Sequence, residues 1–298
     1  MRDAPMISPA LRAYSGSRTD PSRWAAWRPR RGDILVCTPS KAGTTWTQTM
    51  IAMLLNGGAD LDRPLNEISP WIDADLGTPA EEVARDLDRQ PGRRVVKTHT
   101  PGDGVPVWEG VSVVAVYRHP LDIFISLRNH ALNMKSRPDH PMAREMSVAV
   151  HDFLTDRATV DDIDHDSVEI FALHYRETVA SGRFADLVCL HYADMVAAGP
   201  AIVAHLDRAL RIGAGEDAIA RVAEATTLAA MRDAAARYVP ASGKGFWHDE
   251  AAFFHSGGTE KWAGLLSEAD LALYEDRMAA AVPDPELRRW LERGSGRL

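Results

Sequence analysis

Residues 33–54, DILVCTPSKAGTTWTQTMIAML, decide the fold. The segment begins as a short apolar run, breaks into small and polar residues around Lys41, and resumes as an apolar pattern at helical spacing after Gly43. This pattern predicts a buried strand followed by a helix whose first backbone N–H groups point at one spot. Lys41 adds a positive charge there, and Gly43 permits close approach of a ligand. The turn therefore predicts a local anion site, for which phosphate is the natural occupant.

The same segment is also compatible with an ordinary strand-to-helix turn that has a threonine cap and a solvated lysine. It is not a Walker A loop, because G-x-x-x-x-G-K-[ST] places the lysine after the second glycine, whereas Lys41 precedes the only glycine here. Taken alone, the segment leaves the anion site and the ordinary turn open.

Strands and helices alternate along the rest of the chain. Short strands with two apolar faces, as in buried parallel sheets, are predicted at residues 33–37, 93–97, 111–117 and 184–190. Helical patterns occupy residues 45–56, 79–88, 120–132, 167–181, 193–212, 217–234 and 267–281. This order predicts an α/β fold, with one domain over residues 1–298 and a central parallel β-sheet flanked by helices. We expect residues 1–31 to form an N-terminal extension, and residues 133–166 and 237–258 to form long loops that cover the substrate and cofactor.

Composition narrows the classes of protein that the chain can represent. The 42 acidic and 34 basic residues give a net charge of -8, which argues against nucleic acid as a partner. Nowhere do 18 apolar residues run together, so no stable membrane insertion is expected. The two cysteines, Cys37 and Cys189, lie in predicted strands and have no metal-ligand spacing around them. We therefore expect a cytoplasmic protein without a bound metal.

Two further strand ends carry polar residues. The segment RRVVKTHTPGD, residues 93–103, delivers Lys97 and His99 to the carboxyl end of its strand, where open α/β sheets bind ligands. His99 is a candidate general base, although a single histidine is more often a cap or a satisfied polar group. The segment VVAVYRHPLDIFISLRNH, residues 113–130, places Arg118 at a strand end and Ser126 two helical turns further on. These two residues suit a second anion site, and the alternative is an arginine paired with Asp122 on a solvated face.

In this order, the segments resemble the PAPS-dependent sulfotransferases, as a bacterial member of the cytosolic type. TPSKAGTTW, residues 38–46, is similar to the 5'-phosphosulfate loop of that family, and Lys97-Thr98-His99 is similar to its K-T-H segment. Arg118 and Ser126 match its 3'-phosphate segment. LVCLHYADM, residues 187–195, and FFHSGGTEKW, residues 253–262, resemble its later motifs. The resemblance implies a P-loop-kinase-like sulfotransferase fold.

The resemblance also implies a role for each matching residue. His99 would take the proton of a hydroxyl acceptor, Lys41 and Lys97 would stabilise charge on the transferring group, and Ser126 would hold Lys41 back until the acceptor arrives. PAPS would be the co-substrate and PAP the product, with no metal. The implied nucleotide-binding residues are Lys41, Ala42, Gly43, Thr44, Thr45, Trp46, Arg118, Ser126, Tyr192, Thr226, Leu228, Ser256 and Gly257.

The chain departs from the family pattern in two places. His255 and Ser256 stand where many relatives have Arg-Lys, so either His255 is protonated or another cation, such as Lys244 or Lys261, is expected to compensate. The dimer signature of animal members is not visible in KWAGLLSEADLALYE, so the sequence leaves a homodimer open. Two other functions stay compatible with the sequence: a catalytically silent nucleotide-binding protein and a small-molecule kinase of related fold.

Apolar residues in the variable loops suggest what the acceptor is. They predict a small apolar molecule with a hydroxyl group, such as a lipid, glycolipid, sterol or phenol. The residues expected to line its pocket are Trp71, Trp108, Phe124, Leu132, Phe246, Trp247 and Phe253.

Overall fold

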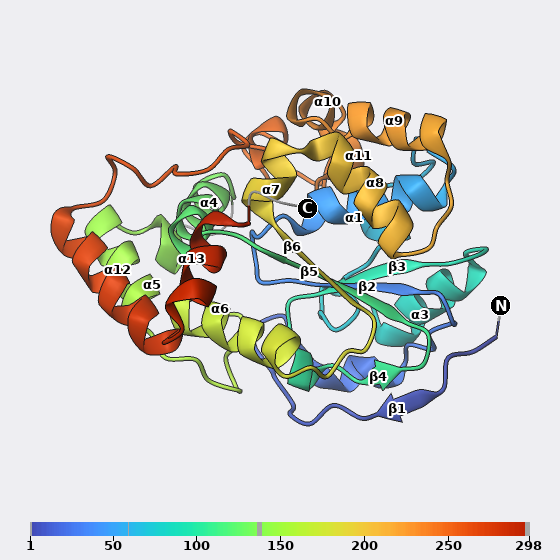
Figure 1. Cartoon of the computed structure of the whole chain (residues 1–298), viewed down its shortest axis with the longest axis horizontal. Coiled ribbons are helices and arrows are strands. Elements are labelled where there is room, and N and C mark those ends of the chain that lie inside the picture. Colours follow the sequence, from blue (N-terminus) through green and yellow to red (C-terminus); the bar gives the residue numbers. More distant parts are fainter. Residues whose placement is uncertain (1, 59, 136–138, 296–298) are drawn as a thin grey trace.

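The computed structural model of the chain describes residues 2–58, 60–135 and 139–295. Its centre is a four-stranded parallel sheet with the strand order β3-β2-β5-β6 (Figure 1). The strands are β2 (Ile34–Cys37), β3 (Val95–Thr98), β5 (Ser112–Tyr117) and β6 (Leu187–His191). A separate antiparallel pair is formed by β1 (Met6–Ser8) and β4 (Val107–Trp108). The predicted α/β fold with one domain around a parallel sheet is confirmed.

Helices surround the sheet on both faces (Figure 1). The α-helices are α1 (Thr44–Leu55), α2 (Leu65–Ile68), α3 (Ala80–Arg89), α4 (Pro120–Leu132), α5 (Met146–Thr155), α6 (Val168–Tyr175), α7 (Tyr192–Ala197), α8 (Gly199–Ala209), α9 (Glu216–Ala225), α10 (Leu228–Asp233), α11 (Ala235–Tyr238), α12 (Glu268–Ala281) and α13 (Pro285–Arg293). Four 3-10 turns, η1 (Pro21–Ala25), η2 (Gly102–Gly104), η3 (Pro141–Ala143) and η5 (Ala251–Phe253), and a π-helical turn, η4 (Arg176–Ala180), complete the chain.

Alternate residues of each strand face two different layers of the core, because side chains alternate along a strand. On β2, Ile34 and Val36 pack in one cluster with α1, α8 and α9. Leu35 and Cys37 pack in another cluster with Leu87 of α3. In Figure 1, α1, α8 and α9 lie above the sheet and α3 lies below it. Both faces of the sheet are therefore covered, which explains why its strands are apolar throughout.

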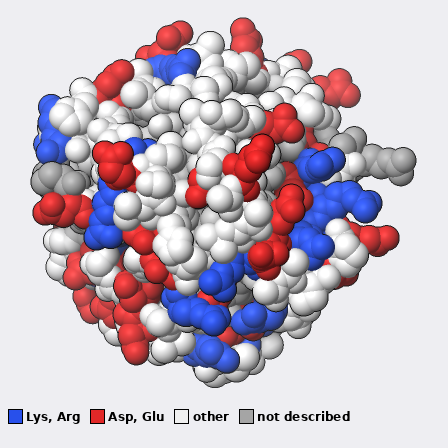
Figure 2. All heavy atoms as spheres, turned by 90° about the vertical axis from the view of Figure 1, so that its left-hand side faces the viewer, with Lys and Arg blue, Asp and Glu red and all other residues white. Residues whose placement is uncertain are grey.

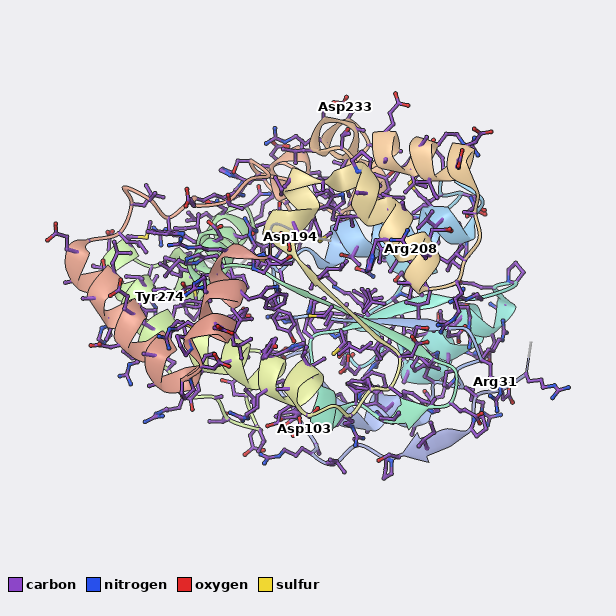
Figure 3. The ribbon with its side chains drawn as sticks, in the orientation of Figure 1. Arg31, Asp103, Asp194, Arg208, Asp233 and Tyr274 are labelled. Carbon is purple, nitrogen blue, oxygen red and sulfur yellow. The ribbon has the colours of Figure 1, made fainter. Side chains whose placement is uncertain are left out.

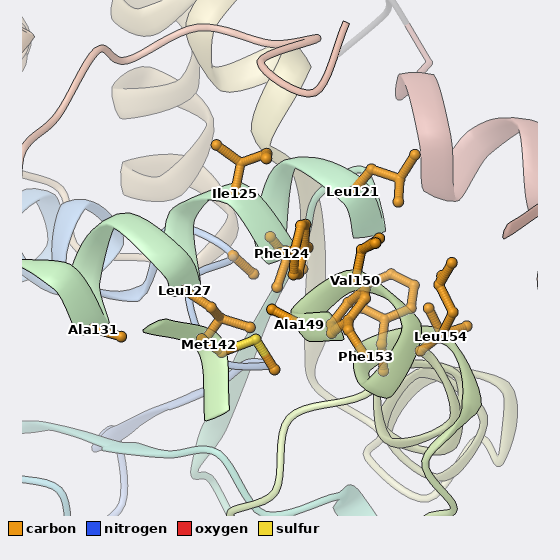
Figure 4. Close-up of a cluster of buried hydrophobic side chains, with 14 of the residues drawn as sticks. Leu121, Phe124, Ile125, Leu127, Ala131, Met142, Ala149, Val150, Phe153 and Leu154 are labelled. Atoms are coloured by element: carbon orange, nitrogen blue, oxygen red, sulfur yellow. The ribbon is translucent and has the colours of Figure 1, made fainter. Parts of the chain in front are cut away.

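A third cluster joins α4, α5, α6 and α12 at the carboxyl end of the sheet. Figure 4 shows Phe124 of α4 facing Val150 and Phe153 of α5, and the rings of Phe124 and Phe153 lie 5.3 Å apart. The prediction of a continuous surface loop over residues 133–166 is thus wrong for residues 146–155. These residues form a helix that buries four apolar side chains: Ala149, Val150, Phe153 and Leu154.

Residues 2–31 pack against the domain rather than extending from it. Trp24 and Trp27 are buried, and their rings lie 6.0 Å and 5.0 Å from that of Trp108 on β4. The hydroxyl of Tyr14 donates a hydrogen bond of 3.1 Å to Asp103, which is labelled in Figure 3. The aromatic residues that signal this packing were present in the sequence, but no periodicity marked them as core.

Two predicted helices are each divided in the structure. The helix expected at residues 193–212 is broken at Ala198, and α8 starts directly afterwards with Pro200 in its first turn, where proline is tolerated. The helix expected at residues 217–234 ends at Ala225, and Thr227 then caps α10 by accepting a hydrogen bond from the backbone N–H of Ala230. The helix α13, whose start is capped by Asp284, was not predicted from the sequence.

The order of the strands fixes where a ligand can bind. From β2 the chain passes to β3 on one side, and β5 then pairs with the other side of β2. The connection after β2 therefore lies at a topological switch point, where a crevice opens at the carboxyl ends of the strands. No helix within the described ranges is long and apolar enough to span a bilayer. On the face shown in Figure 2, acidic and basic side chains are interspersed.

A buried ion pair joins the amino-terminal ends of β2 and β3, at the side of the sheet opposite the crevice. This pair allows a prediction about stability. Arg94 and Asp33 are both fully buried and meet at 2.6 Å. We expect Asp33→Ala to lower the free energy of unfolding by ~3–5 kcal/mol, because it leaves a buried guanidinium short of its partner. Denaturation by urea measures the loss.

A matched control is Asp60→Ala, which removes an exposed carboxylate 2.9 Å from Arg237. It is expected to cost less than ~1 kcal/mol, since exposed ion pairs contribute little. Equal losses in the two variants would contradict the prediction.

Candidate active site

The turn after β2 has the geometry of an anion cradle. Lys41 has a φ of 59° and Gly43 a φ of 120°, and Gly43 is the N-cap of α1. A Cβ atom at Gly43 would lie 3.1 Å from the Tyr192 ring, so a side chain there would be both strained and crowded. The hydroxyls of Thr38 and Thr44 are 2.6 Å apart and brace the turn.

His99 follows β3 and is oriented by the backbone of the same turn. Its Nδ1 lies 2.7 Å from the carbonyl oxygen of Thr38. A carbonyl oxygen only accepts hydrogen bonds, so Nδ1 carries the proton and Nε2 keeps its lone pair. Lys97 Nζ lies 3.5 Å from Nε2, and the ring of Trp71 packs edge-on at 4.6 Å. Burial, followed by the charge of Lys97, holds the pKa of His99 well below 6.5, so the imidazole is a neutral hydrogen-bond acceptor.

Two lysines in the same region have depressed pKa values. Burial and then the charges of Lys97 and Arg118 lower the pKa of Lys41 to about 7. Burial lowers the pKa of Lys97 to about 8. Lys41 Nζ lies 3.1 Å from Nδ1 of His130 on α4 and 4.4 Å from the centre of the Phe253 ring. These ammonium groups are held in a partly dry space, where an anion would stabilise their charged forms.

Arg118 lies at the end of β5 and faces the same space. Its guanidinium carbon is 4.1 Å from the centre of the Tyr192 ring, and Nη2 donates a 3.1 Å hydrogen bond to the carbonyl oxygen of Gly258. Asp122 does not form an exposed ion pair with Arg118. Its carboxylate is buried and accepts hydrogen bonds from the backbone N–H groups of Glu260, at 3.0 Å, and Lys261, at 2.7 Å.

Lys261 is brought beside Arg118 by that contact with Asp122. Burial and the charge of Arg118 lower the pKa of Lys261 to about 8. His255 and Ser256 lie nearby but are exposed, and the pKa of His255 is lowered from 6.5 by burial and by Lys261. A protonated His255 is therefore not favoured. Lys244 and Lys261 both line the cavity, and Lys261 is close enough to Arg118 for its pKa to be affected.

One cavity of about 1210 Å³ contains these groups. Almost every predicted site residue lines it: Lys41, Gly43, Thr44, Thr45, Trp46, Lys97, His99, Arg118, Ser126, Tyr192, Thr226, Leu228, Ser256 and Gly257. Ala42 does not, because its side chain is fully buried beneath the turn. Of the residues expected around the acceptor, Trp71, Phe246, Trp247 and Phe253 line the cavity. The expectation is wrong for Phe124, which belongs to the core, for Trp108, which packs among the N-terminal tryptophans, and for Leu132, which is 52% exposed.

The structure differs from the expectations at two further contacts. Lys41 hydrogen-bonds to His130 rather than to Ser126, which lies one helical turn earlier on α4. The Thr226 hydroxyl donates to the carbonyl oxygen of Val222 at 2.7 Å, so its proton is already used. His130 was missed by sequence reasoning, although its spacing of four residues from Ser126 places both on one face of a helix.

Carboxylates and a further arginine also border the cavity. Asp164 accepts hydrogen bonds from the backbone N–H groups of Arg18 and Thr19, at 2.6 Å and 2.9 Å, and thereby joins the N-terminal segment to the cavity wall. Burial raises the pKa of Asp166 to about 6. Within the part of the chain that the structure describes, no group of three or more His, Cys, Asp and Glu residues could hold a metal ion.

Comparison with known proteins gives the family to which the chain belongs. Residues 31–284 match the sulfotransferase domain family, so the chain belongs to the sulfotransferases and is a transferase enzyme. It is similar to glycolipid sulfotransferases of Mycobacterium bovis (strain BCG / Pasteur 1173P2), at 32% identity over 311 residues, and Mycobacterium tuberculosis (strain ATCC 25618 / H37Rv), at 32% over 309. In both cases the match covers 94% of this chain and 94% of the relative. Membership of this family excludes the small-molecule kinase of related fold, which was also compatible with the sequence.

Solved structures share the fold. A mouse sulfotransferase, SULT7A1, complexed with PAP matches with a TM-score of 0.67 and 17% identity, over 91% of this chain and 92% of that chain. Retinol dehydratase in a complex with retinol and PAP matches with a TM-score of 0.64 and 18% identity, over 86% of this chain and 82% of that chain. The predicted sulfotransferase fold is confirmed.

The buried histidines predict how stability depends on pH. Burial is the first cause of a lowered pKa in each of His99, His119, His130, His174 and His191. For His174 the pKa is about 3, whereas an unfolded histidine has a pKa near ~6.5. Below ~6.5 the unfolded chain therefore takes up protons that the folded chain excludes, so stability falls as the pH falls. At about pH 5, His174 alone would cost about 2 kcal/mol.

Asp73 and Asp166 have pKa values that are raised to about 6. Because folding favours their protonated forms, each carboxyl adds about 1 kcal/mol to the stability of the folded protein as the pH falls. Five histidines outweigh two carboxyls, so we expect lower stability at about pH 5 than at about pH 7.5 in chemical denaturation. His248→Gln changes an exposed imidazole and should keep the wild-type pH dependence. Equal or greater stability at the acidic pH would refute this account.

Proposed function

We propose that the enzyme transfers a sulfuryl group from PAPS to a hydroxyl group of a glycolipid-like acceptor in the cytoplasm, with His99 as the general base. The observation that carries this proposal is the cavity itself. Its cationic lining includes Lys41, Lys97, Arg118 and Lys261, and the three lysines have depressed pKa values. A neutral imidazole lies among them, with its Nε2 3.5 Å from Lys97 Nζ. A donor with two anionic groups and a hydroxyl nucleophile are the ligands that suit such a site.

The donor would occupy the end of the cavity between α1 and the loop before α12. The backbone N–H groups of residues 41–46, with the hydroxyls of Thr44 and Thr45, suit the 5'-phosphosulfate, since helix N-termini favour anions. Arg118 and Lys261 suit the 3'-phosphate, with Lys261 in place of the Arg-Lys pair. Trp46 meets the Tyr192 ring edge-on at 5.7 Å and would offer an aromatic face to adenine. The PAP complexes of the two structural neighbours support this assignment of the donor.

The reacting groups follow from the polarity of the site. His99 Nε2 would take the proton of the acceptor hydroxyl, a contribution of typically ~10²–10⁴ in rate. Lys41 would stabilise the charge that develops on the bridging oxygen as the S–O bond breaks, and Lys97 would stabilise the equatorial oxygens. Ser126 lines the same wall of the cavity and would bind the 3'-phosphate.

The acceptor would occupy the other end of the cavity. Its wall combines the aromatic rings of Trp71, Phe246, Trp247 and Phe253 with the polar groups of Arg18, Asp164 and Asp166. Aromatic faces with carboxylates and a guanidinium suit a sugar, and the apolar area suits a lipid chain. The glycolipid sulfotransferases to which the chain is similar support this acceptor class.

The first test uses His99→Ala. We expect this variant to lose sulfuryl transfer from labelled PAPS to a glycolipid by about 10²-fold or more, because it removes the imidazole that would take the proton of the acceptor. PAP should still raise its thermal midpoint, since His99 does not bind the phosphates. His248→Gln is the control and should keep full transfer.

Two outcomes would change the assignment. PAP binding without transfer in the wild-type protein would favour the catalytically silent nucleotide-binding alternative. Transfer by His99→Ala at the wild-type rate would exclude His99 as the base.

A second test follows from the pKa values of the lysines. At about pH 8, Lys41 with a pKa of about 7 is mostly neutral in the free protein. PAP phosphates beside it would raise its pKa, so binding should take up protons at that pH. Isothermal titration calorimetry in buffers of different ionisation enthalpy measures this uptake. Binding of PAP with no proton uptake would show that Lys41 does not meet the nucleotide.

A further inference from the structure

A second cavity adjoins the main cavity at the acceptor end. Its volume is about 420 Å³, which falls within the ~300–1,000 Å³ typical of sites that hold small ligands. Every residue that lines it is polar or charged, except Pro141 and Met142. Five residues line both cavities: Ser17, Arg18, His140, Asp164 and Asp166. The main cavity therefore continues into a polar space that the reaction outlined above does not use.

The wall shared by the two cavities comes from the N-terminal segment and from the loop after α5. The carboxylate of Asp164 accepts hydrogen bonds from the backbone N–H groups of Arg18 and Thr19 and from the Thr19 hydroxyl, at 2.6, 2.9 and 2.9 Å. A Cβ atom at Gly16 would lie 2.5 Å from Oδ2 of Asp164, so a side chain there would displace the carboxylate. The carbonyl oxygen of Arg18 accepts a 2.7 Å hydrogen bond from the N–H of Asp75. The backbone of Arg18 is therefore held from two sides.

The side chain of Arg18 has unused hydrogen-bonding capacity. Its Nε is buried and has no hydrogen-bond partner among the described residues. A buried donor without a partner costs free energy, which an oxygen atom of a ligand would recover. Burial is the main cause of the lowered pKa values of Lys97 and His99, and the charge of Arg18 contributes to both shifts. The guanidinium therefore lies near the groups proposed to react.

Asp166 supplies a hydrogen-bond acceptor at the same wall. Burial raises its pKa to about 6, whereas the charge of Arg18 and a hydrogen bond from Ser40 lower it. The side chain is therefore mostly a carboxylate at about pH 7.5. Burial lowers the pKa of Lys41, and the charge of Asp166 opposes that shift, so Asp166 lies within electrostatic range of the turn before α1. A donor on Arg18 and an acceptor on Asp166 thus occur together where the two cavities meet.

The hydroxyl groups of a sugar suit this pair better than an ion does. A guanidinium donates to hydroxyl oxygens, and a carboxylate accepts from hydroxyl groups. An anionic group would be repelled by Asp166, and a cationic group would be repelled by Arg18. An alkyl chain does not suit the second cavity, because it would bury polar groups without giving them hydrogen bonds.

We propose that Arg18 and Asp166 bind hydroxyl groups of the sugar that receives the sulfuryl group, and that the second cavity binds a further sugar linked to it. The acceptor is then a glycolipid with two or more sugars. Its lipid chain lies along the aromatic wall of the main cavity, and its sugars extend into the polar space. This inference rests on the proposed function and narrows the acceptor class that it names.

The experiment compares three acceptors with the same alkyl chain: octanol, octyl glucoside and octyl maltoside, each below its micellar concentration. For each protein, kcat/KM is measured with labelled PAPS, and binding of PAP is tested by thermal shift. Arg18→Gln and Asp166→Asn remove the charges of the pair. Asp162→Asn changes a residue that lines the second cavity and not the main one. Asp161→Asn is the control, since Asp161 is an exposed carboxylate of the same loop and lines neither cavity.

In the wild-type protein, we expect kcat/KM to be about tenfold or more higher for octyl maltoside than for octyl glucoside, the factor that corresponds to one hydrogen bond to a charged group. Arg18→Gln and Asp166→Asn should each lower the values for both glycosides by a similar factor relative to octanol, which has no sugar. Asp162→Asn should lower the value for octyl maltoside alone. Asp161→Asn should match the wild-type protein with all three acceptors.

The results that would overturn the inference differ from those that would overturn the proposed function. Equal kcat/KM for the two glycosides in the wild-type protein, or an unchanged preference for octyl maltoside in Asp162→Asn, would refute the subsite for a second sugar. Equal losses with octanol and with the glycosides in Arg18→Gln and Asp166→Asn would refute sugar binding by this pair. In these cases transfer is retained, so the proposed function stands. Absence of a PAP shift and of transfer to all three acceptors in the wild-type protein would refute the proposed function and this inference with it.

Discussion

The site depends on one constraint. The fold holds several positively charged side chains close together at the carboxyl ends of the parallel strands. Parallel pairing of β3, β2 and β5 brings three strand ends together, and these ends carry Lys97, the turn around Lys41, and Arg118. Burial lowers the pKa values of both lysines, and the charges of Lys97 and Arg118 lower the pKa of Lys41 further. Such an arrangement costs stability in the free protein, and an anion bound among the cations would recover it. The fold therefore holds the cavity in a state that favours an anionic ligand over water.

Much of this arrangement could be predicted from sequence because each part has a local signature. The apolar run at residues 33–37, the glycine that begins α1 and the proline that opens α4 each specify backbone geometry within a few residues. His99 and Arg118 follow their strands directly, so placing the strands also places the side chains. The α5 helix lacked such a signature, since its four buried residues are embedded in a stretch rich in charge and proline. Residues 1–31 were missed as core for a related reason: isolated tryptophans carry no period.

Contacts between distant segments could not be predicted in the same way. The bond between Lys41 and His130 joins positions 89 residues apart, and the position of His130 depends on how Trp247 and Phe253 pack against α4. A resemblance to a family supplies roles for matching positions, and it assigned the restraint of Lys41 to Ser126. The structure gives that hydrogen bond to a residue one helical turn further along, where the side chain is longer and can reach the amine. The hydrogen-bond partner of Lys41 thus depends on which side chain of this helix face reaches its amine.

A contact between distant segments also affects the positive charge that residues 253–262 bring to the cavity. His255 and Ser256 stand where the family pattern has Arg-Lys, so this segment lacks two cations of that pattern. Asp122 changes this outcome, because its buried carboxylate accepts the backbone N–H groups of Glu260 and Lys261 and turns the loop toward Arg118. Burial, followed by the charge of Arg118, then lowers the pKa of Lys261 to about 8. A carboxylate thus raises the positive charge of the cavity by ordering a loop rather than by pairing with the arginine. The sequence named Lys261 as one of two lysines that could compensate, and the contact with Asp122 explains why Lys261 lies near Arg118.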